Sequence, residues 1–160
     1  MKMVLEVKPD QCTLVPDPPY VLTSDTGWDT VGQQGFLQDI VGKLREAGIR
    51  VSLFLNPEPE LIESAASTGG DRIELYTGGY ARAYHDDRDE AVRPHSETAN
   101  AAREVGLGVN AGHDLNLVNL KFYAERVSGL LEVSIGHALI CDALYYGIQN
   151  VIDMYLHQLK

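Results

Sequence analysis

The chain alternates short apolar runs with segments in which apolar residues recur every three or four positions. Apolar runs of four to seven residues stand at residues 11–15, 49–55, 72–76, 107–110 and 131–135. Runs of this length are typical of β-strands. The run at 49–55 is so continuously apolar that we expect a strand buried on both faces, as in a parallel sheet.

Helical periodicity fills the intervals between these runs. We expect helices around residues 36–44, 61–66, 92–105, 117–127, 138–146 and 148–159. Gly48 and Gly106 mark the ends of two of these helices, since glycine commonly ends a helix. Two histidines, His95 and His157, fall within the expected helices, and we expect both at the surface.

Five β-α units in succession predict a single domain over residues 1–160, of the α/β class and with a parallel sheet. Two architectures fit this alternation. One is a five-stranded doubly wound sheet of the flavodoxin type, and the other is five units of a (β/α)8 TIM barrel. In either architecture, function belongs at the carboxyl ends of the strands.

The composition is that of an ordinary globular domain, with 44% hydrophobic residues among 160. The 13 Lys and Arg against 23 Asp and Glu give a net charge of −10, which argues against a nucleic-acid partner because such surfaces need clustered basic side chains. No apolar run approaches the roughly 18 residues of a transmembrane helix, and the first residues do not resemble a secretory signal. We expect no membrane association, a cytoplasmic location and buried, unpaired thiols at Cys12 and Cys141.

Glu74 is the most informative single residue in the pattern. In a strand over 72–76, Ile73 and Leu75 would face the helices, so Glu74 would point the other way with Arg72 and Tyr76. A doubly wound sheet covers that side with helices, where an unpaired carboxylate is costly. A barrel lumen offers polar partners instead, which favours the barrel. The alternative is a structural ion pair between Glu74 and Arg72 or a frayed edge strand.

Two glycine-histidine pairs follow successive predicted strands. His113, after Gly112, can transfer a proton near neutral pH. Gly136 and His137 open a helix, where unpaired N–H groups and the helix dipole form a phosphate site. Each pair alone is also compatible with a surface histidine or a simple turn.

The polar loop at residues 23–29 contains the hydroxyls of Thr23 and Ser24 and one exposed-looking tryptophan, Trp28. We expect this loop to be either an ordinary helix cap or a lid over a ligand site at the carboxyl ends of the strands. The charged segment at 85–89 is expected to be a solvated loop, and we expect no metal site. No glycine-rich nucleotide loop and no CxxC pair occurs.

Several motifs then occur in a fixed order along the chain. They are Leu14–Pro16 with Thr23–Asp29, Val51–Phe54, Ile73–Ala81, Val109–Asn116 and Ile135–Ile140. This series resembles the PdxJ family of pyridoxine 5′-phosphate synthases along essentially the whole chain. The resemblance implies the last five β-α units, strands 4 to 8, of a (β/α)8 barrel that lacks its first three units.

The resemblance also implies an activity, namely condensation of 1-deoxy-D-xylulose 5-phosphate with 3-amino-2-oxopropyl phosphate to pyridoxine 5′-phosphate in vitamin B6 biosynthesis. His113 matches the family's proton donor, and Glu74 matches the acid that stabilises the transition state. Thr23 lies where the family contacts the deoxyxylulose phosphate. The family uses no metal or organic cofactor.

The remaining matches concern the second phosphate and the assembly. Gly136 and His137 match the phosphate site for the amino ketone, whereas Asp114 replaces a glycine, and its charge is expected to weaken phosphate binding. Family members form octamers, so we expect a homo-oligomer or a partner chain that supplies the missing strands.

Two hypotheses follow. The first is a pyridoxine 5′-phosphate synthase that is incomplete as this chain alone and therefore shows little or no turnover. The alternative is a non-catalytic phosphate-ligand binding or assembly module derived from the same barrel.

Overall fold

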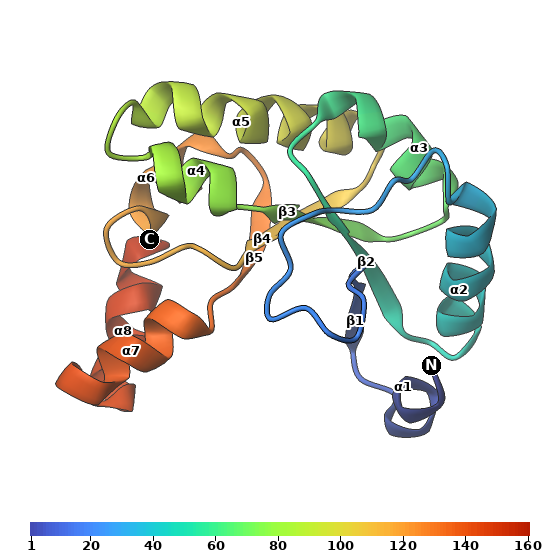
Figure 1. Cartoon of the computed structure of the whole chain (residues 1–160), viewed down its shortest axis with the longest axis horizontal. Coiled ribbons are helices and arrows are strands. Elements are labelled where there is room, and N and C mark those ends of the chain that lie inside the picture. Colours follow the sequence, from blue (N-terminus) through green and yellow to red (C-terminus); the bar gives the residue numbers. More distant parts are fainter.

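The computed structural model describes residues 1–160 and contains one five-stranded sheet. Its strands are β1 (Gln11–Leu14), β2 (Arg50–Leu55), β3 (Arg72–Tyr76), β4 (Gly108–Gly112) and β5 (Leu130–Ser134). All neighbouring strands are parallel, and they lie in chain order from β1 to β5 (Figure 1). The predicted α/β class and parallel sheet are confirmed. The flavodoxin-type alternative is wrong because it requires β1 beside β3.

The helices follow the strands in alternation. They are α1 (Lys2–Val7), α2 (Gln34–Glu46), the 3₁₀ turn η1 (Pro59–Leu61), α3 (Ile62–Ser67), α4 (Gly78–Ala83), α5 (Arg88–Glu104), α6 (Leu120–Arg126), α7 (His137–Tyr146) and α8 (Ile148–Gln158). From α2 through α3, α5 and α6 to α8, each helix contacts the next (Figure 1). The sequence pattern did not predict α1 or α4. No helix is long and apolar enough to cross a membrane.

The sheet has one apolar face and one polar face. Ile73 and Leu75 of β3 are fully buried in the core with the inward side chains of α2, including Leu37. Between Ile73 and Leu75, Glu74 points away from the core and contacts Thr13 of β1. This is the orientation that the sequence pattern predicts, and it leaves a polar face on which a site can form.

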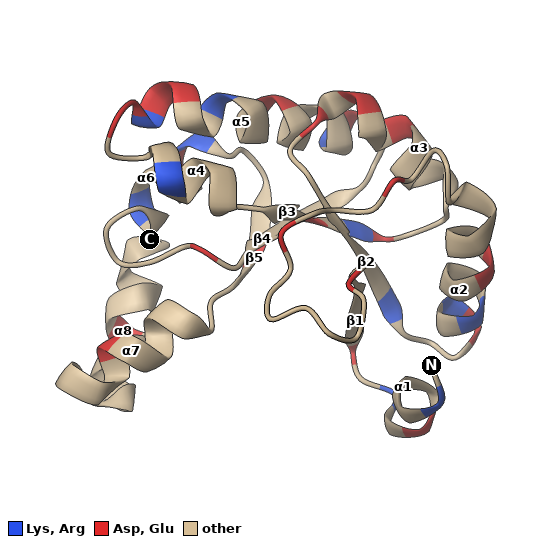
Figure 2. Ribbon diagram, in the orientation of Figure 1, with Lys and Arg blue, Asp and Glu red and all other residues tan.

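Charge is distributed unevenly over the helices. The helix α5 contains four acidic residues and α2 contains two, whereas α7 and α8 contain one each, Asp142 and Asp153, and no Lys or Arg (Figure 2). Both cysteines are unpaired, as expected. Cys12 is half-buried, but Cys141 is exposed on α7, so the expectation of a buried thiol is wrong there.

His95 corrects another expectation. It is 2% exposed, and its Nδ1 lies 2.9 Å from the hydroxyl of the fully buried Tyr123. The helix α5 carries small residues at Ala99 and Ala102 on the same face, so His95 continues a buried stripe at helical spacing. His157 on α8 is exposed, as expected.

Burial makes the stability of the protein depend on pH through His95. Desolvation lowers the pKa of His95 from 6.5 to about 4. Between these values the unfolded chain binds a proton that the folded chain excludes. The free energy of unfolding therefore decreases as the pH falls from 6.5 to 4, by roughly 3 kcal/mol from this group.

Urea denaturation at several pH values measures this contribution. We expect the difference in unfolding free energy between the wild type and His95→Gln to shrink as the pH falls from 6.5 to 4. Substitution of the exposed His85 by Gln is the matched control and leaves the pH dependence as in the wild type. A constant difference between His95→Gln and the wild type would contradict a neutral, buried His95.

Candidate active site at the carboxyl ends of the strands

An open pocket lies at the carboxyl ends of β4 and β5. Its volume of about 770 Å³ falls within the range of small-molecule sites. The residues that line it are Thr23, His113, Asp114, Ser134, Ile135, Gly136 and His137. The structure therefore brings together Thr23, His113, Asp114, Gly136 and His137, all selected from sequence, although they come from three segments far apart in the chain.

Strand pairing explains why the two glycine-histidine pairs meet. Gly112 at the end of β4 pairs with Ser134 at the end of β5. The backbone N–H of His113 donates to the carbonyl of Ser134 at 3.1 Å, which extends the strand contact by one residue. Gly136 follows two residues later as the N-cap of α7. Adjacent parallel strands thus deliver both pairs to one edge of the sheet.

His113 has an unusual backbone conformation. Its φ of 88° lies in the left-handed region, which residues other than glycine rarely adopt. Its imidazole packs against Phe54, with 5.0 Å between ring centroids and 32° between the ring planes, and meets Tyr76 edge-on at 6.4 Å. These two rings come from β2 and β3, so the imidazole lies over the polar face of the sheet.

Glu74 does not line the pocket but lies beside it on β3. It is 5% exposed, and its Oε2 accepts a hydrogen bond of 3.1 Å from the hydroxyl of Thr13. Burial raises the pKa of Glu74 above the ordinary value, while the Thr13 hydrogen bond and the charge of His113 act against this rise. A buried carboxyl with a raised pKa is suited to hold or release a proton nearer neutrality.

Gly112 connects Glu74 to His113. A Cβ atom on Gly112 would lie 2.5 Å from Oε1 of Glu74 and 3.1 Å from Cβ of Ser134. The missing side chain therefore provides the space in which the Glu74 carboxylate reaches the end of β4. The residue that precedes His113 thus contacts Glu74, and the two candidate catalytic residues share one neighbourhood.

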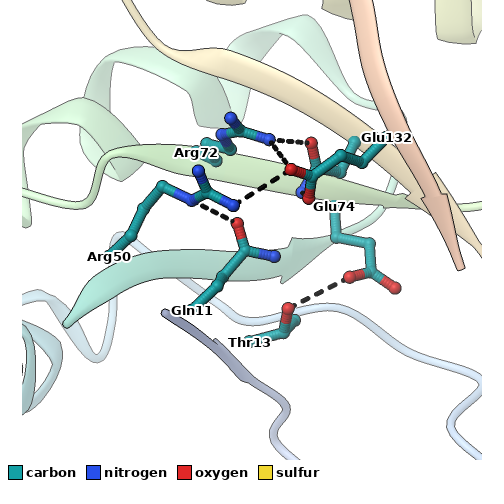
Figure 3. Close-up of polar contacts among 7 residues, drawn as sticks. Gln11, Thr13, Arg50, Arg72, Glu74 and Glu132 are labelled. Carbon is teal, nitrogen blue, oxygen red and sulfur yellow. Dashed lines mark hydrogen bonds and ion pairs between the residues drawn. The ribbon is translucent and has the colours of Figure 1, made fainter. Parts of the chain in front are cut away.

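A second polar cluster occupies the same face of the sheet and includes one residue from every strand. Its members are Gln11, Arg50, Arg72, Asn110 and Glu132 (Figure 3). Oε1 of Glu132 accepts a hydrogen bond from Arg50 at 3.0 Å and forms an ion pair with Arg72 at 2.8 Å. The expected alternative pair between Glu74 and Arg72 is therefore wrong, because Arg72 is engaged by Glu132 and by Asn110, at 3.0 Å.

The loop at residues 23–29 is held at its base. The indole Nε1 of Trp28 donates to the carbonyl of Leu14 at 2.9 Å, and its backbone N–H donates to the carbonyl of Phe54, also at 2.9 Å. Ser24 is buried and donates to Asp17, whereas Thr23 is exposed at the pocket. Trp28 is thus half-buried rather than exposed, and the lid function stays a prediction.

Sequence reasoning missed Thr13 and Ser134, which contact Glu74 or line the pocket. Only their positions in the strands could have indicated them, because side chains alternate along a strand and these two fall on the polar face. The charged segment 85–89 is exposed, as expected, but the expectation of a loop is wrong for its last two residues, because α5 begins at Arg88. Asp87 accepts from the backbone N–H of Glu90 at the start of α5, and Asp89 pairs with Arg126 at 3.0 Å.

The close fit at Gly112 is testable by adding one methyl group. Gly112→Ala is expected to destabilise the protein by about 1–3 kcal/mol, because the Cβ atom displaces the Glu74 carboxylate. The control is Gly42→Ala in the interior of α2, where no atom lies within 4 Å of the new Cβ. That change is expected to stabilise the helix by about 1 kcal/mol. Urea denaturation measures both, and wild-type stability in Gly112→Ala would contradict the placement of Glu74.

Comparison with known proteins identifies the family. Residues 1–160 match the family model described as "Pyridoxal phosphate biosynthesis protein PdxJ". The pyridoxine 5′-phosphate synthase of Cytophaga hutchinsonii is 51% identical over 158 residues, covering 99% of this chain and 66% of that protein. That of Flavobacterium johnsoniae is also 51% identical, with 99% and 67% coverage. That of Parabacteroides distasonis is 53% identical over 153 residues, with 96% and 64% coverage.

The chain thus spans about two thirds of the length of these curated relatives. Among solved structures, N-(5′-phosphoribosyl)anthranilate isomerase from Pyrococcus furiosus is 11% identical, with a TM-score of 0.32 and coverage of 98% of this chain and 91% of that one. With this TM-score and identity, the comparison supports no conclusion about fold or function. The family model and the relatives both match nearly the whole length of the chain, and the chain belongs to the PdxJ family.

Proposed function

We propose that this chain supplies the proton donor and the phosphate-binding elements of a pyridoxine 5′-phosphate synthase. The observation that carries the proposal is the pocket in which His113 meets Gly136 and His137, in a chain about half identical to proteins of that name. The reaction is the condensation of 1-deoxy-D-xylulose 5-phosphate with 3-amino-2-oxopropyl phosphate. It yields pyridoxine 5′-phosphate, inorganic phosphate and water.

The chemistry requires repeated proton transfers. An amine and a ketone form a C=N bond only if the carbonyl oxygen is protonated and leaves as water. His113, in the pocket, can donate this proton, because histidine exchanges protons near neutral pH. Glu74 lies beside Gly112, the residue before His113, and its carboxylate stabilises positive charge that develops on the reacting atoms.

The phosphate groups bind at the ends of the pocket. Gly136 is the N-cap of α7, a helix of ten residues whose first N–H groups have no partner within the helix. These donors and the helix dipole attract an anion even though the whole chain has a charge of −10. The reason is that the electrostatic potential at the site depends mainly on the nearest charges and dipoles. The hydroxyl of Thr23 contacts the deoxyxylulose phosphate, and His137 contacts the phosphate of the amino ketone.

We further propose that the five strands are strands 4 to 8 of a (β/α)8 barrel, and that residues 1–160 form one domain of it. Three observations support this proposal. The strands follow chain order, the sheet has a polar face, and β1 and β5 are edges with one neighbour each. A homo-oligomer, or a chain that supplies further strands, would cover these edges. The assembled enzyme is proposed to act in the cytoplasm.

Asp114 provides a test of the phosphate site. Its negative charge lines the same pocket as Gly136, so it opposes an anionic ligand. Asp114→Gly is expected to bind pyridoxine 5′-phosphate roughly tenfold more tightly by calorimetry, since removing one like charge at short range is worth about 1–4 kcal/mol.

Asp114→Asn separates charge from size. An increase in affinity in both variants assigns the effect to charge, and an increase in Asp114→Gly alone assigns it to closer approach of the backbone. Unchanged affinity in both variants would contradict a phosphate in this pocket.

The isolated chain provides a test of completeness. With one histidine and one buried carboxylate for several proton transfers, and with two open sheet edges, we expect the purified 160-residue chain to form little or no pyridoxine 5′-phosphate. We expect turnover to be restored by adding a polypeptide that carries the third of a relative, such as the Cytophaga hutchinsonii enzyme, to which this chain does not align. We expect His113→Asn to abolish the restored turnover.

Each outcome of this assay separates the hypotheses. Turnover by the chain alone would contradict the need for further strands. Tight binding of pyridoxine 5′-phosphate with no turnover in the mixture would favour the non-catalytic binding module.

A further inference from the structure

Thr77 holds the backbone on both sides of His113. It lies directly after β3, is fully buried and does not line the pocket. Its Oγ1 donates to the carbonyl of Gly112 at 2.5 Å and accepts from the backbone N–H of Asp114 at 3.1 Å. Its own backbone N–H also donates to the Gly112 carbonyl, at 3.3 Å.

These contacts fix both peptide planes that flank the Cα atom of His113. The Gly112 carbonyl belongs to the peptide before His113, and the Asp114 N–H belongs to the peptide after it. Because peptide groups are planar, the orientations of these two planes set φ and ψ of His113. The hydroxyl of Thr77 thereby links the two planes and supports a φ of 88°, which a histidine rarely adopts without such support.

No other contact does the same. The bond from the His113 N–H to Ser134 holds only the first of the two planes. The second plane, at Asp114, has its N–H bonded to Thr77 alone. The contact between the imidazole and Phe54, at 5.0 Å, depends on this backbone, since a return to negative φ would swing the side chain away from the ring.

We propose that Thr77 is a positioning residue that aims the imidazole of His113 into the pocket. This inference rests on the proposed function, which makes His113 the proton donor. Thr77 itself touches neither the pocket nor its ligand and acts only through the His113 backbone.

The test uses the 160-residue chain and three variants. Thr77→Val keeps the shape and removes the hydroxyl, Thr77→Ser keeps the hydroxyl, and Thr98→Val is the matched control. Thr98 is also fully buried, but its hydroxyl donates to the carbonyl of Pro94 within α5, away from the pocket. The readout is the NMR signal of the His113 ring, which we expect the ring current of Phe54, 5.0 Å away, to shift upfield.

We expect Thr77→Val to lose this upfield shift, and Thr77→Ser and Thr98→Val to retain it. We also expect Thr77→Val to bind pyridoxine 5′-phosphate about tenfold more weakly, as the loss of a buried hydrogen-bonding group implies, and Thr77→Ser to restore the binding. A wild-type His113 signal in Thr77→Val would overturn the proposal.

Two further observations keep the test decisive. If the wild type does not bind pyridoxine 5′-phosphate, the proposed function fails, but the ring signals still decide whether Thr77 positions His113. If Thr77→Val does not fold, hydrogen exchange of the wild type decides. The Asp114 amide must then be protected although its side chain is exposed, and rapid exchange of that amide would overturn the proposal.

Discussion

The structure depends on how the polar face of the parallel sheet satisfies its own charges. Arg72, whose side chain is only 16% exposed, must find partners, because a charge taken from water without them costs several kcal/mol. Here Glu132 of β5 forms ion pairs with Arg50 of β2 and Arg72 of β3 (Figure 3). Asn110 of β4 accepts a hydrogen bond from Arg72 and donates one to Glu132. Because both arginines are engaged in this cluster, neither pairs with Glu74. That carboxylate is left with the neutral partner Thr13, and burial keeps its pKa raised.

The candidate site lies at the carboxyl ends of the strands and results from their parallel arrangement. Parallel strands end at one edge, so the segments after β4 and β5 meet there, and the absent side chain of Gly112 lets Glu74 reach the same place. The chain has a net charge of −10, yet α7 has no acidic residue in its first turn. The N-terminus of α7 at Gly136 can therefore present N–H donors to an anion, with Asp114 as the opposing charge in the pocket.

The strands and most helices were predictable because each apolar run has the length and continuity of a buried strand. The orientation of Glu74 was also predictable, since side chains alternate along a strand. Other features were not. The burial of His95 depends on Tyr123, which is distant in sequence and supplies its polar partner. The partner of Arg72 is Glu132, sixty residues further along, and no local pattern indicates that pair over one with Glu74.

The alternation of apolar runs and helical segments along the chain thus determined, by itself, the α/β class, the parallel sheet and the residues at the strand ends. It did so because burial and periodicity are local properties of the chain. Only the tertiary structure decided the strand order, the convergence of Thr23 with His113 and Gly136, and the left-handed backbone of His113. These features depend on contacts between distant segments, such as the bonds from Thr77 to the peptides flanking His113, and such contacts leave no periodic mark in a sequence.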